Sequence, residues 1–257
     1  MGAVRFSFRL CRGPDDGDSP LFWNFGPSSL AGFFFFCIFF QEIGGFMKLK
    51  LLPILALMLP LVTLAAEVGD VVKFDAPPQK VGRDVMQAFA NRKSGTSFSG
   101  RPVPEKDLGN VLWAANGINR PKTGMRTAPS ALNKQDIDLY VFDQKSVFKY
   151  NPKDHSMSVV VKGDHRSLFT ERMKTPVIIL LVSDISKFSD GMGTEDDHRR
   201  MGAFDAGIVS QNISLYCSAL GIATRVRASM DGPGIQKLLG LSEKQIPMLN
   251  HAIGYNK

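Results

Sequence analysis

Cysteine is scarce in this chain of 257 residues, which contains only three. Cys11 and Cys37 lie near the amino terminus, and Cys217 is the one cysteine of residues 67–257. A domain made from those residues has no internal disulfide, so its stability must come from a hydrophobic core. Apolar residues make up 44% of the chain and charged residues 21%, the composition of a globular protein.

Common signatures of metal sites and activated nucleophiles are also missing. The four histidines have no ligand spacing with cysteines or carboxylates, so no metal site is predicted. Neither a G-x-S-x-G elbow nor a phosphate-binding P-loop occurs. Cys217 lies in an apolar stretch and is expected to be a small core residue. We therefore predict no catalytic acid, base or nucleophile.

A large excess of one charge is absent as well. Five of the 31 basic and four of the 24 acidic residues fall within residues 1–66, which leaves a net charge of +6 on the remainder. This excess favours anionic ligands, but it is too small and too scattered to indicate a nucleic-acid partner.

No apolar run reaches the ~20 residues that a membrane-spanning helix needs. Residues 47–66 combine a basic start, an apolar middle at 51–64 and a small-residue end, which is the pattern of a secretory signal peptide. Cleavage after Ala65 or Ala66 would export the protein to the periplasm or the extracellular space, with no membrane span left; an uncleaved anchor is the alternative. Residues 1–46 are then expected to be a non-native or disordered extension.

Hydrophobic periodicity predicts one α+β domain over residues 67–257. The expected helices are 82–91, 104–116, 195–220 and a short one after 232–234. The expected strands are 137–142, 147–150, 157–161, 177–182, 222–227 and 247–254. The run 177–182 is continuously apolar, as in a strand buried on both faces. The helix over 203–220 is apolar on most of its circumference, which predicts burial in the core or at a subunit interface.

Arg92, Lys93 and Ser94 place two cations and a hydroxyl on consecutive residues, just after the first expected helix. Cations and hydroxyl donors of this kind can surround a phosphate monoester. The alternative is a solvated helix end, where cations favour the helix dipole.

Residues 126–135 form a tight loop of small residues with an amide side chain, and such a loop can approach a flat ring closely. Alone, it could equally be an ordinary turn before a strand.

The order of these segments resembles the nitroreductase family over nearly all of residues 82–255. Residues 112–118 together with 126–130 look closest to its thiazole/oxazole-dehydrogenase-like branch. The resemblance implies an α+β fold with a mixed sheet flanked by helices. It also implies an intertwined homodimer that holds FMN between its subunits.

The resemblance assigns particular residues to the cofactor. Arg92 and Ser94 match the residues that grip the ribityl phosphate, and Lys93 lies between them in the same cationic turn as a further cofactor-binding residue. Thr96 matches a position, usually basic, at the flavin N1–O2 edge. Pro129, Ser130, Ala131 and Asn133 match the loop that the partner subunit lays on the flavin, and Ala228 and Ser229 match backbone donors near N5 and O4. Arg172 or Lys174 could replace the cation that Thr96 lacks. Lys257 is the one basic residue beyond the last strand that could reach the phosphate.

The implied function is an FMN-dependent oxidoreductase that transfers hydride through flavin N5 to or from a small organic substrate. NAD(P)H is a candidate donor, but it is scarce outside the cytosol. An exported protein must therefore use another donor, or it is an azoline-dehydrogenase-like oxidase that oxidises its substrate and passes electrons to oxygen or quinone. An alternative of a different class, favoured by Thr96, is a non-catalytic flavin- or ligand-binding protein.

Overall fold

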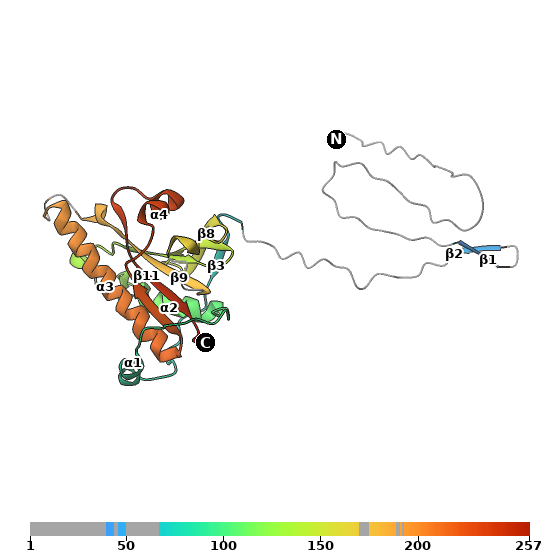
Figure 1. Cartoon of the computed structure of the whole chain (residues 1–257), viewed down its shortest axis with the longest axis horizontal. Helices are drawn as coiled ribbons and strands as arrows, with labels where there is room; N and C mark the ends of the chain where they lie inside the picture. Colours follow the sequence, from blue (N-terminus) through green and yellow to red (C-terminus); the bar gives the residue numbers. More distant parts are fainter. Residues whose placement is uncertain (1–39, 44–45, 50–66, 170–174, 189–190, 192) are drawn as a thin grey trace. The chain divides into compact units, whose positions relative to one another are not determined.

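The computed structural model describes residues 40–43, 46–49, 67–169, 175–188, 191 and 193–257 (Figure 1). The chain divides into two compact units, Met1–Thr63 and Leu64–Lys257. In the first unit, β1 (Phe40–Ile43) and β2 (Phe46–Leu49) form an antiparallel hairpin, and most of the predicted extension and signal peptide lies outside the described residues. Among the helices of the described residues, none has the length and apolar character to cross a bilayer.

The second unit is built on a seven-stranded sheet. Its strands are β3 (Val71–Lys73), β6 (Ile137–Phe142), β7 (Ser146–Asn151), β8 (Ser156–Lys162), β9 (Val177–Asp184), β10 (Ala223–Arg227) and β11 (Gln245–Gly254). Their order across the sheet is β10-β11-β9-β6-β7-β8-β3. The six strands predicted from the sequence are confirmed.

The sheet is buried on both faces at its centre. Val177, Ile179 and Leu181 of β9 belong to a core cluster with residues of the helices on one face. The alternating residues Ile178 and Leu180 belong to a second cluster on the other face. Because side chains alternate along a strand, a strand covered on both sides must be apolar throughout, which confirms the prediction for residues 177–182.

The helices are α1 (Val85–Asn91), α2 (Glu105–Asn116), α3 (Glu195–Leu220) and α4 (Gly232–Leu239). In α3 the side chains of Thr194 and Asp197 form a capping box, in which each accepts a hydrogen bond from the backbone N–H of the other. Gly221 ends the helix with a positive φ angle of 72°. The predicted helices are confirmed, although α4 begins at Gly232 itself. Asp231 caps α4, and a proline in the first turn suits its start.

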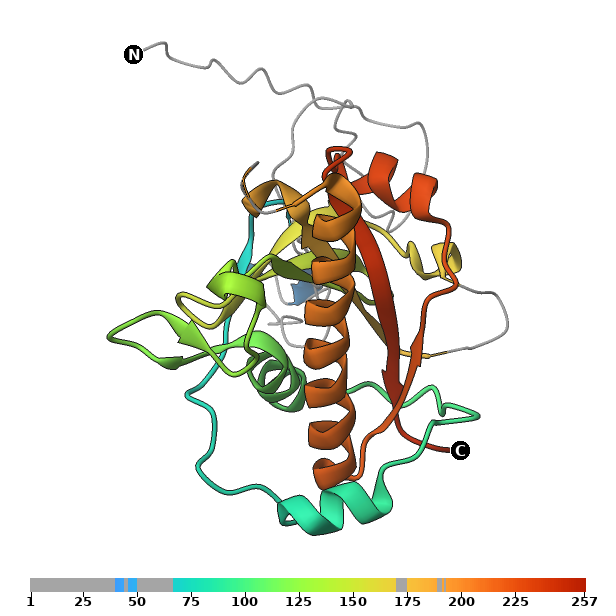
Figure 2. The same ribbon diagram turned by 90° about the vertical axis from the view of Figure 1, so that its left-hand side faces the viewer.

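Figure 2 shows α3 lying lengthwise across one face of the sheet, with α2 beside it and α1 across its carboxyl-terminal end. One side of α3 is buried in the core. On its other side Phe204 is 66% exposed and Ile208 is also exposed. Burial in the core, one of the two alternatives predicted for α3, is confirmed on one side of the helix, and a subunit interface on the other side stays a prediction.

The α+β class is confirmed, but the predicted mixed sheet is antiparallel at every strand pairing. The physical reason lies in the connections. The chain leaves β9 through α3 to the edge strand β10, then returns through α4 to β11, which inserts between β10 and β9 and runs against both. The parallel contact in the second unit is an isolated bridge between Ser94 and Thr224.

Several short elements were not predicted. They are β3, the hairpin of β4 (Ile118–Arg120) and β5 (Met125–Arg126), and the 3₁₀ turns η1 (Ala131–Asn133), η2 (Arg166–Leu168) and η3 (Ile185–Lys187). Each is two or three residues long, too short for a hydrophobic period to develop.

Candidate functional site

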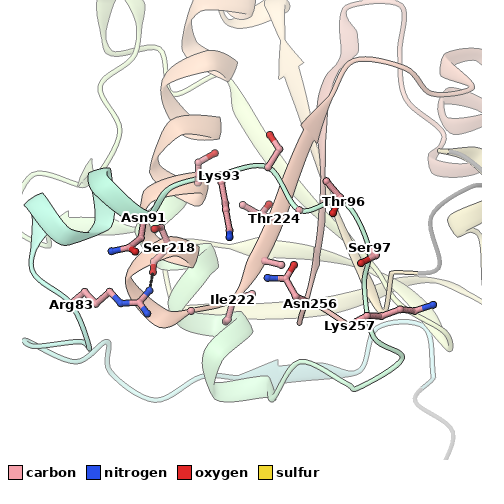
Figure 3. A pocket seen from close by; sticks show the side chains of 15 residues that line it. Arg83, Asn91, Lys93, Thr96, Ser97, Ser218, Ile222, Thr224, Asn256 and Lys257 are labelled. Atoms are coloured by element: carbon pink, nitrogen blue, oxygen red, sulfur yellow. Dashed lines mark hydrogen bonds between the residues drawn. The ribbon is translucent and has the colours of Figure 1, made fainter.

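The segment after α1 runs along the edge strand β10 and encloses a cavity there. Ser94 forms a parallel bridge with Thr224, and the Gly95 N–H donates to the Thr224 carbonyl at 2.8 Å. The cavity has a volume of about 620 Å³ (Figure 3). It is lined by Arg83, Asn91, Lys93, Ser94, Gly95, Thr96, Ser97, Ser214, Ser218, Gly221, Ile222, Ala223, Thr224, Asn256 and Lys257.

The lining contains three cationic side chains and no acidic side chain. In Figure 3 the Lys93 side chain points into the cavity, whereas Lys257 extends away past Ser97. On the opposite wall the Arg83 guanidinium donates to the Ser218 carbonyl at 2.9 Å. Fixed positive charge without a nearby acid favours an anion in this space.

Hydroxyl groups add hydrogen-bond donors to this charge. Among the described residues, the hydroxyls of Ser94, Thr96 and Ser97 have no hydrogen-bond partner. By contrast, the Ser218 hydroxyl donates to the Ala88 carbonyl at 2.8 Å and Ser214 to its own helix. The donors available to a ligand therefore come from the 94–97 segment, beside the Lys93 ammonium, and together they suit the oxygens of a dianion.

A buried polar chain supports the wall of the cavity. His251 of β11 is fully buried; its Nε2 lies 2.8 Å from the Ser210 hydroxyl and its Nδ1 lies 3.0 Å from the Thr224 hydroxyl. Burial lowers the pKa of His251 to about 3. The imidazole is therefore neutral, and it ties α3 to β10 and β11 as a structural group.

The structure brings together some of the predicted cofactor-binding residues. Lys93, Ser94 and Thr96 line the cavity, and the carboxyl-terminal Lys257 reaches its rim. Arg92 is not among the lining residues: it follows α1 as an exposed cap, with its N–H donating to the Phe89 carbonyl at 3.3 Å.

Arg83, Asn91, Asn256 and the α3 serines were not predicted as lining residues. Arg83 and Asn91 flank α1 without any motif of their own, and the serines sit on the buried side of an apolar helix. Asn256 could have been found from topology, because β11 pairs with β10 and carries the chain end to the same edge.

The predicted ring-covering segment, the 129–135 loop, does not line the cavity. Within the loop, the Ser130 hydroxyl accepts from the Gln135 N–H at 2.8 Å. The Ala131 N–H donates to both carboxyl oxygens of Asp205 on α3, at 3.0 and 2.9 Å. The loop is thus anchored to α3 rather than to β10.

The two anchor points lie far apart on the same helix. Asp205 and Ser218 are 13 residues apart, which is about 20 Å along an α-helix. In Figure 2, η1 lies beside the amino-terminal half of α3 and α1 crosses the opposite end. Within one chain, the cavity and the 129–135 loop are therefore separate.

The segment after β10 also lies outside the cavity lining. The Asn250 amide donates to the carbonyls of Arg227 and Ser229 at 3.2 Å each. In the described part of the chain, the N–H groups of Ala228 and Ser229 make no hydrogen bond, so they are available as donors.

Arg227, which precedes them, has an unusual environment. Its Nε and Nη2 atoms are buried without a hydrogen-bond partner among the described residues. Burial, then the nearby Arg225, lowers the pKa of its guanidinium. The two cations suggested from the sequence, Arg172 and Lys174, lie outside the described residues.

Two other kinds of site, a metal centre and a reactive cysteine, are not found among the described residues. No group of three or more His, Cys, Asp or Glu residues there could hold a metal ion. Cys217 is fully buried, and burial raises the pKa of its thiol to about 12, so it is a core residue as predicted.

Comparison with known proteins identifies a family. The model described as "Nitroreductase family" matches residues 89–255. The chain is similar to a Ralstonia eutropha JMP134 protein provisionally assigned as a nitroreductase, with 28% identity over 73% of this chain and 90% of that one, and a TM-score of 0.68. Comparison with curated proteins gives no significant match.

Two more distant structures share the fold. One is the Escherichia coli microcin synthetase McbBCD complex with truncated pro-MccB17 bound, with 18% identity over 65% of this chain and 70% of that one, and a TM-score of 0.58. The other is a Staphylococcus epidermidis ATCC 12228 protein provisionally assigned as an NAD(P)H:FMN oxidoreductase, with 14% identity over 69% of this chain and 89% of that one, and a TM-score of 0.50.

Proposed function

Because the chain belongs to the nitroreductase family, we propose that it is an FMN-dependent oxidoreductase acting on a small organic substrate. The observation that carries this proposal is the cavity at β10, whose lining has no acidic side chain. The Lys93 ammonium and the hydroxyl of Ser94, a residue that the family resemblance matches to the ribityl phosphate, both line this cavity. This donor set fits a phosphate monoester better than a neutral or cationic ligand.

Bound FMN would supply the hydride chemistry at its N5 atom. The residues of this chain would bind and orient it. Lys93 and Ser94 would hold the phosphate, and Thr96 would lie toward the N1–O2 edge of the ring. The N–H groups of Ala228 and Ser229 would donate to the polar edge of the ring, with their segment fixed by the Asn250 amide.

Arg227 is our candidate for the cation that Thr96 does not provide. Its guanidinium directly precedes the two proposed ring donors, and two of its nitrogens are buried without partners in the described part of the chain. Partly buried guanidinium nitrogens without partners are unfavourable by themselves but favourable beside developing negative charge. We infer that it faces the N1–O2 edge of the flavin.

The proposal includes a homodimer. The 129–135 loop lies about 20 Å along α3 from the cavity, so a second copy of the chain is our proposed source of the loop that covers each flavin. Exposed apolar side chains support such an interface: Phe204 is 66% exposed on α3, and Leu132 is 63% exposed at the tip of the loop. Sedimentation of the full chain should give a dimer, and a monomer at micromolar concentration would contradict this part of the proposal.

Export remains a proposal from the sequence. Amino-terminal sequencing of the native protein should begin after residue 65 or 66. Recovery of any peptide from residues 1–46 would contradict the expected start at Met47.

The test of function is spectroscopic. The purified full chain should carry, or take up, one FMN per subunit, and anaerobic addition of NADH or NADPH should bleach the flavin. If the flavin stays oxidised with both nucleotides, the reductase proposal fails. Reduction of that flavin by an azoline substrate would then indicate the oxidase, and reduction by neither would indicate a flavin carrier. A folded chain that binds no FMN would overturn all three.

A further inference from the structure

Two buried carboxyl groups meet beneath the 129–135 loop. Asp136 precedes β6 and is fully buried, and Asp205 of α3 is only 3% exposed. The Ser183 hydroxyl donates to Asp136 Oδ2 at 2.6 Å, and the Ala131 N–H donates to both oxygens of Asp205. Ser183 also packs against Gly202, which lies one helical turn before Asp205 on α3, so the two carboxyl groups approach each other beside this hydroxyl.

Neither carboxyl group has a cationic partner among the described residues, although cations are close by. From β5, Arg126 donates to the Gln135 side chain at 3.0 Å. From η3, Lys187 donates to the Gln135 carbonyl at 3.0 Å and lies 4.0 Å from Asp138. Asp138 itself pairs with Lys149 at 2.7 Å. The nearby cations therefore contact the end of the loop and β6. Arg126 is close enough to Asp136 for their charges to attract, but neither Asp136 nor Asp205 forms an ion pair within the described residues.

The remaining charged neighbours in the described part of the chain form no ion pair with Asp136 or Asp205 either. Lys134, on the loop itself, makes no ion pair in the described part of the chain. The Asp184 carboxylate accepts from the side chain of Ser186. On α3, Asp197 pairs with Arg200 at the first turns, away from the Asp pair.

One proton would satisfy the pair. Asp136 Oδ1 is buried and has no hydrogen-bond donor among the described residues. Two adjacent buried carboxylates repel strongly unless they share a proton. A protonated Asp205 would donate to the unsatisfied oxygen of Asp136. In agreement, burial, and then the hydrogen bond to Asp136, raises the pKa of Asp205 to about 7.

The loop above the pair depends on such anchoring. Leu132, Asn133 and Gln135 all have positive φ angles, of 52°, 54° and 49°. Residues other than glycine are disfavoured in this region and need surrounding contacts to hold them there. The Ala131–Asp205 hydrogen bonds attach this strained turn to α3.

We propose that Asp136 and Asp205 are positioning residues that share one proton, and that loss of this proton releases the 129–135 loop. The consequence for the cofactor rests on the proposed function, which lays this loop on the flavin of the partner subunit. The direction follows from charge. As the pH rises, Asp205 ionises beside the buried Asp136. The Ala131 N–H binds the anion more strongly, but burial and the proximity of Asp136 outweigh this gain, so opening of the loop becomes more favourable and the loop covers the flavin less firmly.

Amide hydrogen exchange of the full chain, without added flavin, tests the shared proton directly. If the open loop holds no proton on the pair, the protection factor of Ala131 should fall about tenfold per pH unit above the pKa of the pair. Asp205→Asn keeps an acceptor for Ala131 and can donate to Asp136, so its protection should stay constant from pH 6 to pH 8. Asp136→Asn is a second variant with the same expectation. Asp196→Asn, an exposed substitution on the same helix, should behave like the unchanged chain.

FMN titration at the same pH values tests the consequence. The unchanged chain should bind FMN several-fold more weakly at pH 8 than at pH 6, and Asp205→Asn should remove that difference. If Ala131 protection does not fall with pH, or falls equally in Asp205→Asn, the shared proton is refuted whether or not FMN binds. If protection falls as expected but the chain binds no FMN at either pH, the proposed function fails while the Asp pair stands.

Discussion

Replacement of Lys93 by alanine tests the phosphate site most directly. The Lys93 ammonium points into a cavity whose lining has no acidic side chain, and it makes no ion pair within the described residues. Its loss should therefore disturb the fold little, by about 0.5 kcal/mol or less, as is usual for exposed side chains. FMN binding should suffer much more, because a hydrogen bond to a charged phosphate contributes about 1.5–3 kcal/mol. This range corresponds to a roughly tenfold to 150-fold rise in Kd.

The assay is a titration of the unliganded chain with FMN and, in parallel, with riboflavin, which has the same ring but no phosphate. Lys93→Ala should weaken FMN binding alone and reduce its dependence on salt. Lys122→Ala, an exposed lysine away from the cavity, is the matched control. Equal weakening of both ligands, or unchanged FMN binding, would refute the assignment of the phosphate to this cavity.

The same titration separates Lys93 from Arg92. The family resemblance assigns the phosphate to Arg92, for which a loss of about 1.5–3 kcal/mol is expected on replacement by alanine. The geometry places Lys93, and not Arg92, in the cavity lining. A larger effect at Arg92 than at Lys93 would mean that the 92–94 segment changes conformation when FMN binds.

Two further predictions concern buried polar groups. His251→Leu leaves two buried hydroxyls unpaired and should destabilise the fold by about 1–3 kcal/mol at neutral pH. Because the folded pKa of His251, about 3, lies below its ordinary value of 6.5, the unfolded chain binds the extra proton between these values. The free energy of unfolding should therefore fall by up to about 1.4 kcal/mol per pH unit on acidification below 6.5. Denaturant titrations at several pH values should show that this free energy depends less on pH in His251→Leu than in the unchanged chain. Arg227→Gln should make the reduction potential of bound flavin more negative, since a cation beside the reduced ring is lost; an unchanged potential in an equilibrium dye titration would exclude Arg227 from the site.

The fold could be predicted from the sequence where local patterns decide it. The apolar run at residues 177–182, the caps of α3 and the proline before α2 each determine an element through nearby residues alone. The direction of strand pairing could not be predicted in this way. It depends on the insertion of β11 between β9 and β10. Packing between distant parts of the chain determines this insertion, and the sequence of a single segment does not reveal it.

The residues of the candidate site divide in the same way, into those that a local motif predicts and those that only the fold brings together. Lys93, Ser94 and Thr96 are neighbours in sequence, and they reach the cavity together. Arg83 reaches it because α1 packs against the end of α3, where its guanidinium finds the Ser218 carbonyl. Asp136 and Asp205 are 69 residues apart and meet only because α3 crosses the sheet above β6. No spacing rule reveals contacts of this kind.

Mixed dimers would decide whether each flavin is shared between two chains. Asn133→Pro should disrupt the 129–135 loop, because proline can neither adopt the positive φ of Asn133 nor donate to the Ser130 carbonyl as its N–H does at 2.9 Å. If one chain supplies the phosphate site and its partner supplies the loop, a dimer of one Lys93→Ala chain and one Asn133→Pro chain has one site with both defects. Its other site combines an intact cavity with an intact loop.

Dimers purified through two different affinity tags should therefore bind one FMN with unaltered affinity, whereas each variant homodimer binds FMN weakly at both sites. If both halves of a site came from the same chain, every site in the mixed dimer would carry one defect and no tight site would remain. The stoichiometry of tight binding thus distinguishes the two arrangements without any knowledge of the substrate. It also tests the role of α3, since Ser218 lines the cavity of one proposed site and Asp205, on the same helix, anchors the loop that covers the other.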